Sequence, residues 1–204
     1  MRVIAGSAGG IRLAVPKNDV RPTMDRVKAA IFSSLGDAVI GARVLDLFAG
    51  SGALGIEALS RGASGVVFVE QDRQSVKTIR VNLGKTKLTG CVRQQDVFDF
   101  LQHASMPETF QIIFADPPYE TTNYSERYTE KILTNHTLPE LLDRGGVFVL
   151  EKRPGELLPE TKYWRVVRQK RYGAAETLFL SAIRNQQSAT PTVSREHAKN
   201  FGVA

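Results

Sequence analysis

The chain has 204 residues, of which 42% are hydrophobic and 24% charged, which excludes a largely disordered protein and leaves room for one full domain rather than two. Its single cysteine excludes an internal disulfide, and it has no apolar run of membrane-spanning length, so we expect a cytoplasmic protein. The net charge of +6 is uneven, with +4 on residues 1–30 and +5 on 152–172 around −4 on 31–151, a pattern that suits either a polyanionic partner or basic faces exposed to solvent.

The first predicted elements form an N-terminal extension, residues 1–36. Apolar runs at 2–6 and 11–15 predict a hairpin whose strands meet across a glycine-rich turn. After a linker, Thr23 is expected to cap a helix that ends at Gly36 and carries on one face Val27, Ala30, Ile31 and Leu35.

From residue 37 to 183, short apolar runs alternate with helical segments. The runs include VLDLF, VVFVE, CVRQ, FQIIFA and GVFVLE. This alternation predicts an α/β fold with a mainly parallel sheet and helices on both faces. Two further strands, WRVVRQKRY and ETLFLSAI, are separated only by a turn, so we expect them to pair antiparallel at the sheet's edge. The polar residues 184–204 are expected to be a disordered tail.

A glycine-rich loop follows the first strand of this domain. Gly50, Gly52 and Gly55 have the G-x-G-x-x-G spacing, and Glu70 ends the next strand where a bound ligand would offer ribose hydroxyls. The loop alone fits a dinucleotide or S-adenosylmethionine, or only tight packing of a helix on a strand. Asp46 favours S-adenosylmethionine, because its carboxylate can meet an amino group and would repel a pyrophosphate.

The second motif is D-P-P-Y, which directly follows the strand FQIIFA. The exocyclic amines of guanine and adenine are weak nucleophiles, because their lone pair is delocalised into the ring. The Asp116 carboxylate and the Pro117 carbonyl can each accept one amino hydrogen and so turn the lone pair toward a methyl donor. Tyr119 offers a face on which an extruded base can stack. The alternative is a proline turn that ends a strand, with Tyr119 as packing.

Asp96 follows the strand CVRQ, where it can bind the adenine amino group of the cofactor, cap the next helix, or do both. The histidines His103, His136 and His197 are isolated, and no cluster has the spacing of a metal site, so we expect no metal. Methyl transfer from a sulfonium also needs none, because the leaving group already carries the charge.

Over about residues 1–183 the chain resembles the bacterial guanine-N2 methyltransferases of small-subunit ribosomal RNA, the RsmD-like proteins. The matching stretches are MRVIAG, RPTMDRVKAAIF, LDLFAGSGALGIEALSRGA, FVEQD, ADPPY and YGAAETLFL. The resemblance implies a class I S-adenosylmethionine-dependent methyltransferase fold, Rossmann-like, with a seven-stranded, mainly parallel sheet whose last strand is antiparallel. It also implies a guanine target in 16S ribosomal RNA, in an assembling or assembled small subunit.

The resemblance and the motifs together give three sets of candidate residues. The catalytic set is Asp116, Pro117 and Tyr119. The cofactor-binding set is Asp46, Phe48, Gly50, Gly52, Glu70, Gln71, Asp96 and Val97. The nucleic-acid-binding set is Arg2, Arg12, Arg21, Arg26, Lys170 and Arg171.

Three other functions compete with this one. An adenine-N6 methyltransferase acting on DNA or RNA shares D-P-P-Y and is separated only by the family-like flanks. A nicotinamide oxidoreductase would explain the glycine loop but neither D-P-P-Y nor the basic flanks. An RNA-binding assembly factor without turnover would have no use for Asp116 and Tyr119.

Overall fold

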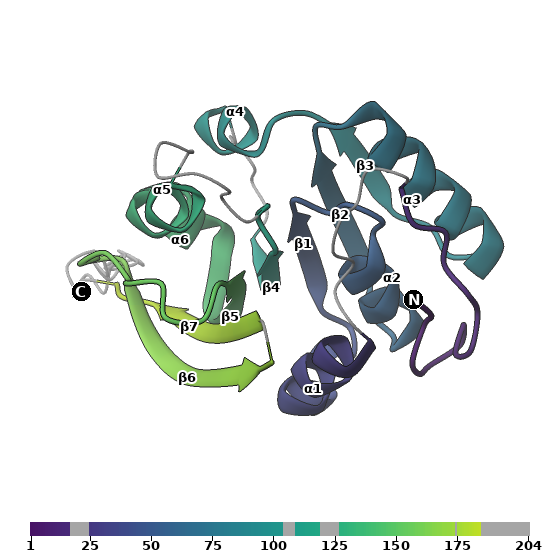
Figure 1. The fold of residues 1–204 in the computed structure, drawn as a ribbon, viewed down its shortest axis with the longest axis horizontal. Coiled ribbons are helices and arrows are strands. Elements are labelled where there is room, and N and C mark those ends of the chain that lie inside the picture. The colour runs from purple at the N-terminus through teal and green to yellow at the C-terminus, as the bar shows by residue number, and fades with distance from the viewer. Residues whose placement is uncertain (17–24, 104–108, 119–126, 174, 185–204) are drawn as a thin grey trace, which may run out of the picture.

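The computed structural model describes residues 1–16, 25–103, 109–118, 127–173 and 175–184. Within these ranges a seven-stranded sheet has the order β3-β2-β1-β4-β5-β7-β6 (Figure 1). The strands are β1 (Arg43–Leu47), β2 (Gly65–Glu70), β3 (Cys91–Gln94), β4 (Phe110–Ala115), β5 (Leu142–Lys152), β6 (Trp164–Tyr172) and β7 (Ala175–Ala182). The first five pair in parallel, and β7 is antiparallel to both of its neighbours. The predicted α/β sheet with an antiparallel last strand is therefore confirmed.

The two C-terminal strands pair antiparallel as expected, and the structure adds their order. β7 lies between β5 and β6, so β6 forms the edge. Burial explains this order, because β7 is buried over most of its length whereas residues 165–170 of β6 are all exposed. Since β6 and β5 are both antiparallel to β7, the carboxyl end of β6 lies at the same edge of the sheet as the carboxyl ends of β1 to β5.

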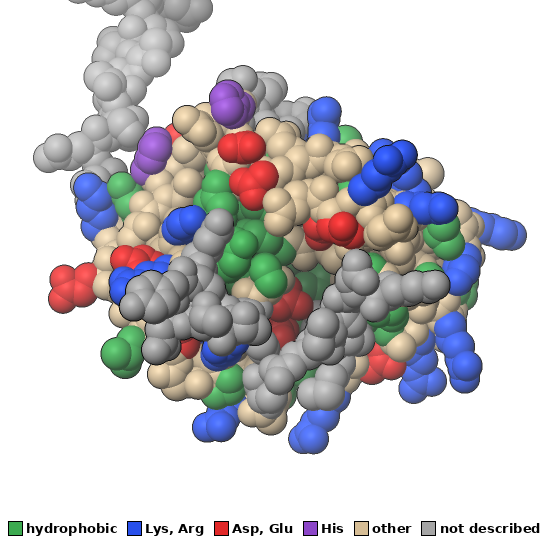
Figure 2. All heavy atoms as spheres, turned by 45° about the horizontal axis from the view of Figure 1, so that its top comes forward, with side chains coloured by type: hydrophobic (Ala, Val, Ile, Leu, Met, Phe, Trp, Pro, Cys, Tyr) green, Lys and Arg blue, Asp and Glu red, His purple; other side chains and the backbone are tan. Residues whose placement is uncertain are grey.

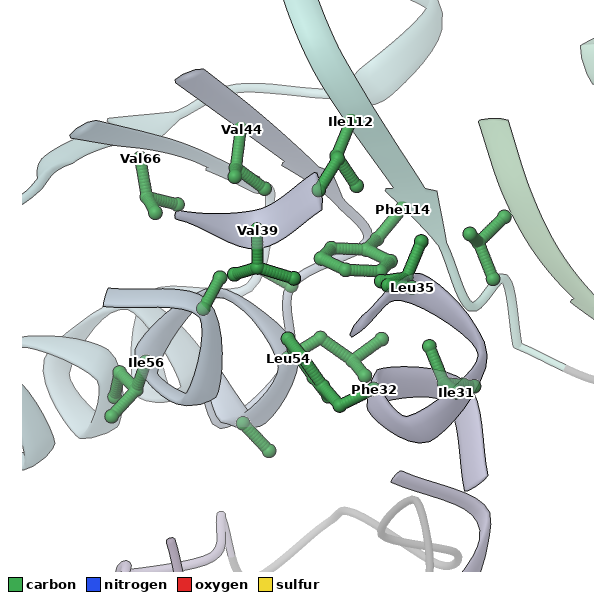
Figure 3. Packing of buried hydrophobic residues seen from close by; sticks show 14 of the residues in the cluster. Ile31, Phe32, Leu35, Val39, Val44, Leu54, Ile56, Val66, Ile112 and Phe114 are labelled. Carbon is green, nitrogen blue, oxygen red and sulfur yellow. The ribbon is translucent and has the colours of Figure 1, made fainter. Parts of the chain in front are cut away.

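Helices cover both faces of the sheet and enclose two hydrophobic clusters. One cluster includes α1 (Asp25–Leu35), the 3-10 helix η1 (Gly36–Val39), α2 (Ala53–Ser60) and α3 (Arg73–Thr86). In it the rings of Phe32 and Phe114 lie 5.7 Å apart, and Ile31, Leu35 and Val39 pack beside them (Figure 3). The other cluster includes α4 (Val97–Gln102), α5 (Tyr128–Thr134) and α6 (Leu138–Leu141). No helix in the described ranges is long and apolar enough to cross a membrane.

Helix α1 buries Val27, Ile31 and Leu35 as predicted, whereas Ala30 is only partly buried. Lys28 is also buried, although no apolar pattern marks it. Its ammonium lies 3.3 Å from the Glu57 carboxylate and donates to the Arg2 carbonyl, which explains how the charge is accommodated. The predicted cap, Thr23, lies outside the described residues.

The predicted N-terminal hairpin is present, but its two arms pair through a single bridge and do not form full strands. Arg2 and Arg12 form one antiparallel bridge, and the Val3 amide donates to the Ile11 carbonyl at 2.9 Å. The segment is held on α2, where both oxygens of Glu57 accept backbone amides of Ile4 and Ala5. The positive φ of +86° at Gly6 and its close approach to the Ser60 carbonyl require glycine there. The hairpin and α1 thus share a hydrophobic cluster with the sheet.

Candidate active site

The glycine loop and the D-P-P segment leave neighbouring strands at the same edge of the sheet. Leu47 at the end of β1 pairs with Ala115 at the end of β4, so Phe48 and Asp116 each follow directly. The loop needs unusual backbone angles, with φ of +55° at Phe48, +52° at Gly50 and +77° at Gly52. Helix α2 begins immediately after it, and its first amides face the loop. The structure therefore brings the two sequence motifs together.

Gly55 has a packing role. A Cβ at this position would lie 2.3 Å from the Phe68 ring, so glycine is needed for α2 to approach β2. The packing interpretation of the glycine pattern therefore holds for Gly55, whereas Gly50 and Gly52 shape the loop itself.

Asp46 lies in β1 beneath the loop and is only 2% exposed. Its Oδ2 accepts the Gly55 amide at 2.9 Å. Burial raises the pKa of Asp46 to about 8, with smaller contributions from the negative charges of Asp116 and Glu70, and the Gly55 hydrogen bond opposes the shift. Asp46 therefore holds a proton over much of the neutral range and would lose it more readily beside a positively charged ligand.

Glu70 ends β2 and fixes the glycine loop to it. One carboxylate oxygen accepts the Gly50 amide at 2.8 Å and the other accepts the Asp72 amide at 2.8 Å. Each oxygen has a second lone pair with which it can accept a hydrogen bond from a hydroxyl group. The adjacent Gln71 is exposed at the same edge.

Asp96 caps the N-terminus of helix α4, which was one of the two roles predicted for it. Its Oδ1 accepts the amides of Phe98 at 2.8 Å and Asp99 at 3.1 Å. The next residue, Val97, is buried. An open hollow of about 490 Å³ lies beside this cap, between α4 and α5, and is lined by Asp96, Phe98, Asp99, Lys131, Thr134 and Asn135.

Three aromatic rings meet above the carboxyl ends of the strands. Phe48 lies 5.6 Å from Tyr128 and 6.1 Å from Phe98, and Phe98 stacks on Tyr128. Figure 2 shows hydrophobic side chains at the centre of this face, with acidic side chains beside them. Of these three, sequence reasoning identified only Phe48, because Phe98 and Tyr128 lie on helices with no motif around them.

The D-P-P segment borders a second, smaller cavity. Asp116 is partly buried, Pro117 is buried and Pro118 is exposed, while Tyr119 lies outside the described residues. The cavity has a volume of about 110 Å³ and is lined by Pro117, Pro118, Tyr128, Thr129, Lys152, Arg153 and Glu156. The last three residues were missed from the sequence because no motif surrounds them.

The candidate nucleic-acid residues divide into two groups. Arg2, Arg12 and Arg26 are exposed on the hairpin and α1, where Arg2 lies 3.9 Å from the Asp25 carboxylate. Lys170 and Arg171 are exposed at the carboxyl end of β6, and the Lys170 ammonium lies 3.3 Å from the Ser34 hydroxyl of α1. Arg21 lies outside the described residues. Across the described ranges, no group of three His, Cys, Asp or Glu residues is placed to hold a metal ion.

Comparison with known proteins gives matches along most of the chain. The model of the family described as conserved hypothetical protein 95 matches residues 1–181. The Bacillus subtilis putative rRNA methyltransferase YlbH is 42% identical over 165 residues, which cover 79% of this chain and 87% of that protein. Ribosomal RNA small subunit methyltransferase D of Haemophilus influenzae is 35% identical over 177 residues, covering 85% and 89%.

A solved structure extends the comparison to ligands. The T. thermophilus 16S rRNA N2 methyltransferase RsmC, in complex with AdoMet and guanosine, has a TM-score of 0.58 and 25% identity, over 81% of this chain and 44% of that one. The described sheet therefore has the expected class I methyltransferase fold.

Proposed function

Because the chain belongs to the conserved hypothetical protein 95 family, we propose that it transfers the methyl group of S-adenosylmethionine to the exocyclic N2 of a guanine in 16S ribosomal RNA. The expected relationship to the RsmD-like rRNA methyltransferases is confirmed by the sequence matches. The observation that best supports methyl transfer to a base amine is the register of β1 and β4, which sets the glycine loop beside Asp116.

The residues around the glycine loop fit the methyl donor. The positive φ values open the loop backbone to a ligand, and Asp46 and Glu70 offer carboxylates to its positive charges and ribose hydroxyls. We assign the remaining contacts to Phe48, Gly50, Gly52, Gln71, Asp96 and Val97. When bound, S-adenosylmethionine supplies an activated methyl group on a sulfonium. The protein orients the donor and limits its contact with water.

The target amine is activated at Asp116 and Pro117. Asp116 accepts one amino hydrogen and the Pro117 carbonyl accepts the other, which restores lone-pair density to the nitrogen. Proline suits this position because it offers a backbone carbonyl but has no backbone N–H that could compete as a donor. After transfer, the proton leaves the amine to Asp116 or water. Tyr119 is proposed to stack on the base.

RNA is proposed to bind across the face that holds the loop, with basic side chains around its rim (Figure 2). Residues 1–36 form the RNA-facing extension with Arg2, Arg12, Arg21 and Arg26, and residues 37–183 form the catalytic domain. Lys170 and Arg171 contribute from the carboxyl end of β6. The substrate is the small subunit, assembled or assembling, in the cytoplasm.

The test is to map methylated nucleosides in ribosomal RNA from cells with and without the gene, by mass spectrometry. We expect one N2-methylguanosine of the small subunit to be missing in the deletion and restored by the purified protein. Loss of N6-methyladenosine instead would support the adenine alternative and refute the guanine assignment. Adding the protein to naked RNA and to isolated subunits distinguishes the two substrates.

A further inference from the structure

The cavity beside Pro117 has one wall with an unusual construction. That wall comes from the end of β5 and the turn that follows it, residues 152–156. The Lys152 side chain is 2% exposed, and its ammonium lies 2.6 Å from the Glu176 carboxylate of β7. It also donates to the carbonyl of Arg153 at 2.9 Å and to that of Glu156 at 2.8 Å. An ammonium has three donors, so all three hydrogens of Lys152 are used within the fold.

Lys152 therefore serves to hold the turn in place rather than to bind a ligand. Glu176 is itself fixed by Gln169 of β6, whose amide donates to it at 2.7 Å. These two hydrogen bonds, the one from Lys152 first, lower the pKa of Glu176 and so favour its carboxylate form. The wall of the cavity is thus tied to three strands, and it carries the exposed side chain of Arg153 at the cavity's rim.

Guanine and adenine differ in the atoms that this arginine would meet. Guanine presents two acceptors, O6 and N7, which match the paired N–H groups of a guanidinium. Adenine presents an amino group in place of O6, and an amino group cannot accept from arginine. With the N2 amine held at Asp116 and Pro117, O6 and N7 lie on the far side of the base.

We propose that Arg153 is the specificity-determining residue for guanine, donating from its guanidinium to O6 and N7 of the target base, with the Lys152–Glu176 pair as the element that positions it. This proposal rests on the proposed function.

The experiment compares two substrates that differ at O6, the atom Arg153 is expected to read, and at N1, which carries a hydrogen in guanine only; the arginine variants separate the two differences. The RNA or subunit methylated by the wild-type protein is prepared with guanine or with 2-aminopurine at the mapped nucleotide. 2-Aminopurine keeps the N2 amine and N7 but lacks O6. The ratio of kcat/KM for the two substrates is measured for wild type, Arg153→Gln, Arg153→Lys and Arg144→Gln. Arg144 is a matched control, since it is an exposed arginine near the other end of β5, about 30 Å away along the strand.

We expect the wild type and Arg144→Gln to prefer guanine by roughly 10- to 100-fold, the range of one good bidentate contact. Arg153→Gln should lose this preference because guanine turnover falls. Arg153→Lys should show an intermediate preference, because lysine keeps the positive charge but lacks the paired N–H donors of a guanidinium. An unchanged preference in Arg153→Gln would overturn the proposal, as would a wild type that treats both bases alike. In both cases N2 methylation, and so the proposed function, would stand. Methyl transfer to adenine would instead refute the proposed function and the role of Arg153 with it.

Discussion

At the residue scale, Asp46 makes protein stability depend on pH. Its folded-state pKa of about 8 lies above the ordinary value of 3.8, so between these two the folded chain holds a proton that the unfolded chain has released. The contribution of Asp46 to the free energy of unfolding is therefore full below about pH 4 and declines as the pH rises to about 8.

Asp46→Asn should remove this dependence, because asparagine is uncharged and can still accept the Gly55 amide. Relative to wild type, the variant should gain a few kcal/mol of stability between pH 5 and pH 8.5, of the order given by the shift. Urea unfolding at several pH values measures this gain. Parallel stability profiles for the two proteins would show that Asp46 titrates normally.

Asp116 is the residue on which the proposed chemistry depends. Asp116→Ala should lower methyl transfer roughly 100- to 10,000-fold, because one acceptor for the target amine is lost. Binding of S-adenosylmethionine, measured by calorimetry, should be nearly unchanged. Asp37→Ala, which removes an exposed carboxylate from η1, should retain full activity. Normal turnover by Asp116→Ala would remove the catalytic assignment.

At the element scale, the sequence predicted the parallel strands well because β1, β2 and β4 are short, mostly apolar runs that are mostly buried. The sequence did not predict the order of β6 and β7. That order depends on the exposure of β6 and the burial of β7 in the folded sheet, and the alternation of strands and helices along the chain does not contain this information. The same limit applies to the site. Asp46, Glu70 and Asp116 stand at strand ends next to motifs, whereas Lys152 and Glu176 are 24 residues apart and meet only because β5 and β7 pair.

The exposed basic end of β6 leads to a prediction about salt. If Lys170 and Arg171 contact phosphates, changing both to glutamine should reduce the slope of log affinity for RNA against log salt by roughly 0.7–0.9 per lost contact. Filter binding across a salt series measures the slope. The matched pair is Lys77→Gln with Arg80→Gln, two exposed residues of α3, which should leave it unchanged. An identical slope in both double variants would mean that the end of β6 faces solvent.

At the scale of the whole molecule, Glu57 of α2 joins the N-terminal hairpin to α1 and α2. Its fully buried carboxylate accepts from Lys28, from Arg61 at 2.7 Å and from two hairpin amides. Glu57→Gln would leave the Lys28 charge buried without its counterion, which costs roughly 3–5 kcal/mol.

Because the hairpin, α1 and the sheet share one hydrophobic cluster, we expect this loss to appear as one cooperative unfolding transition shifted to lower denaturant. Chemical denaturation followed by circular dichroism tests this, with Glu140→Gln as the exposed control. Separate melting of residues 1–36 would show instead that the extension folds independently.

The most direct test of the whole account is transfer of an isotopically labelled methyl group by the purified protein. Small subunits from cells lacking the gene are incubated with labelled S-adenosylmethionine, and the RNA is digested to nucleosides for mass spectrometry. We expect the label to be recovered as N2-methylguanosine. Label in a methylated adenosine, or none in RNA, would contradict it.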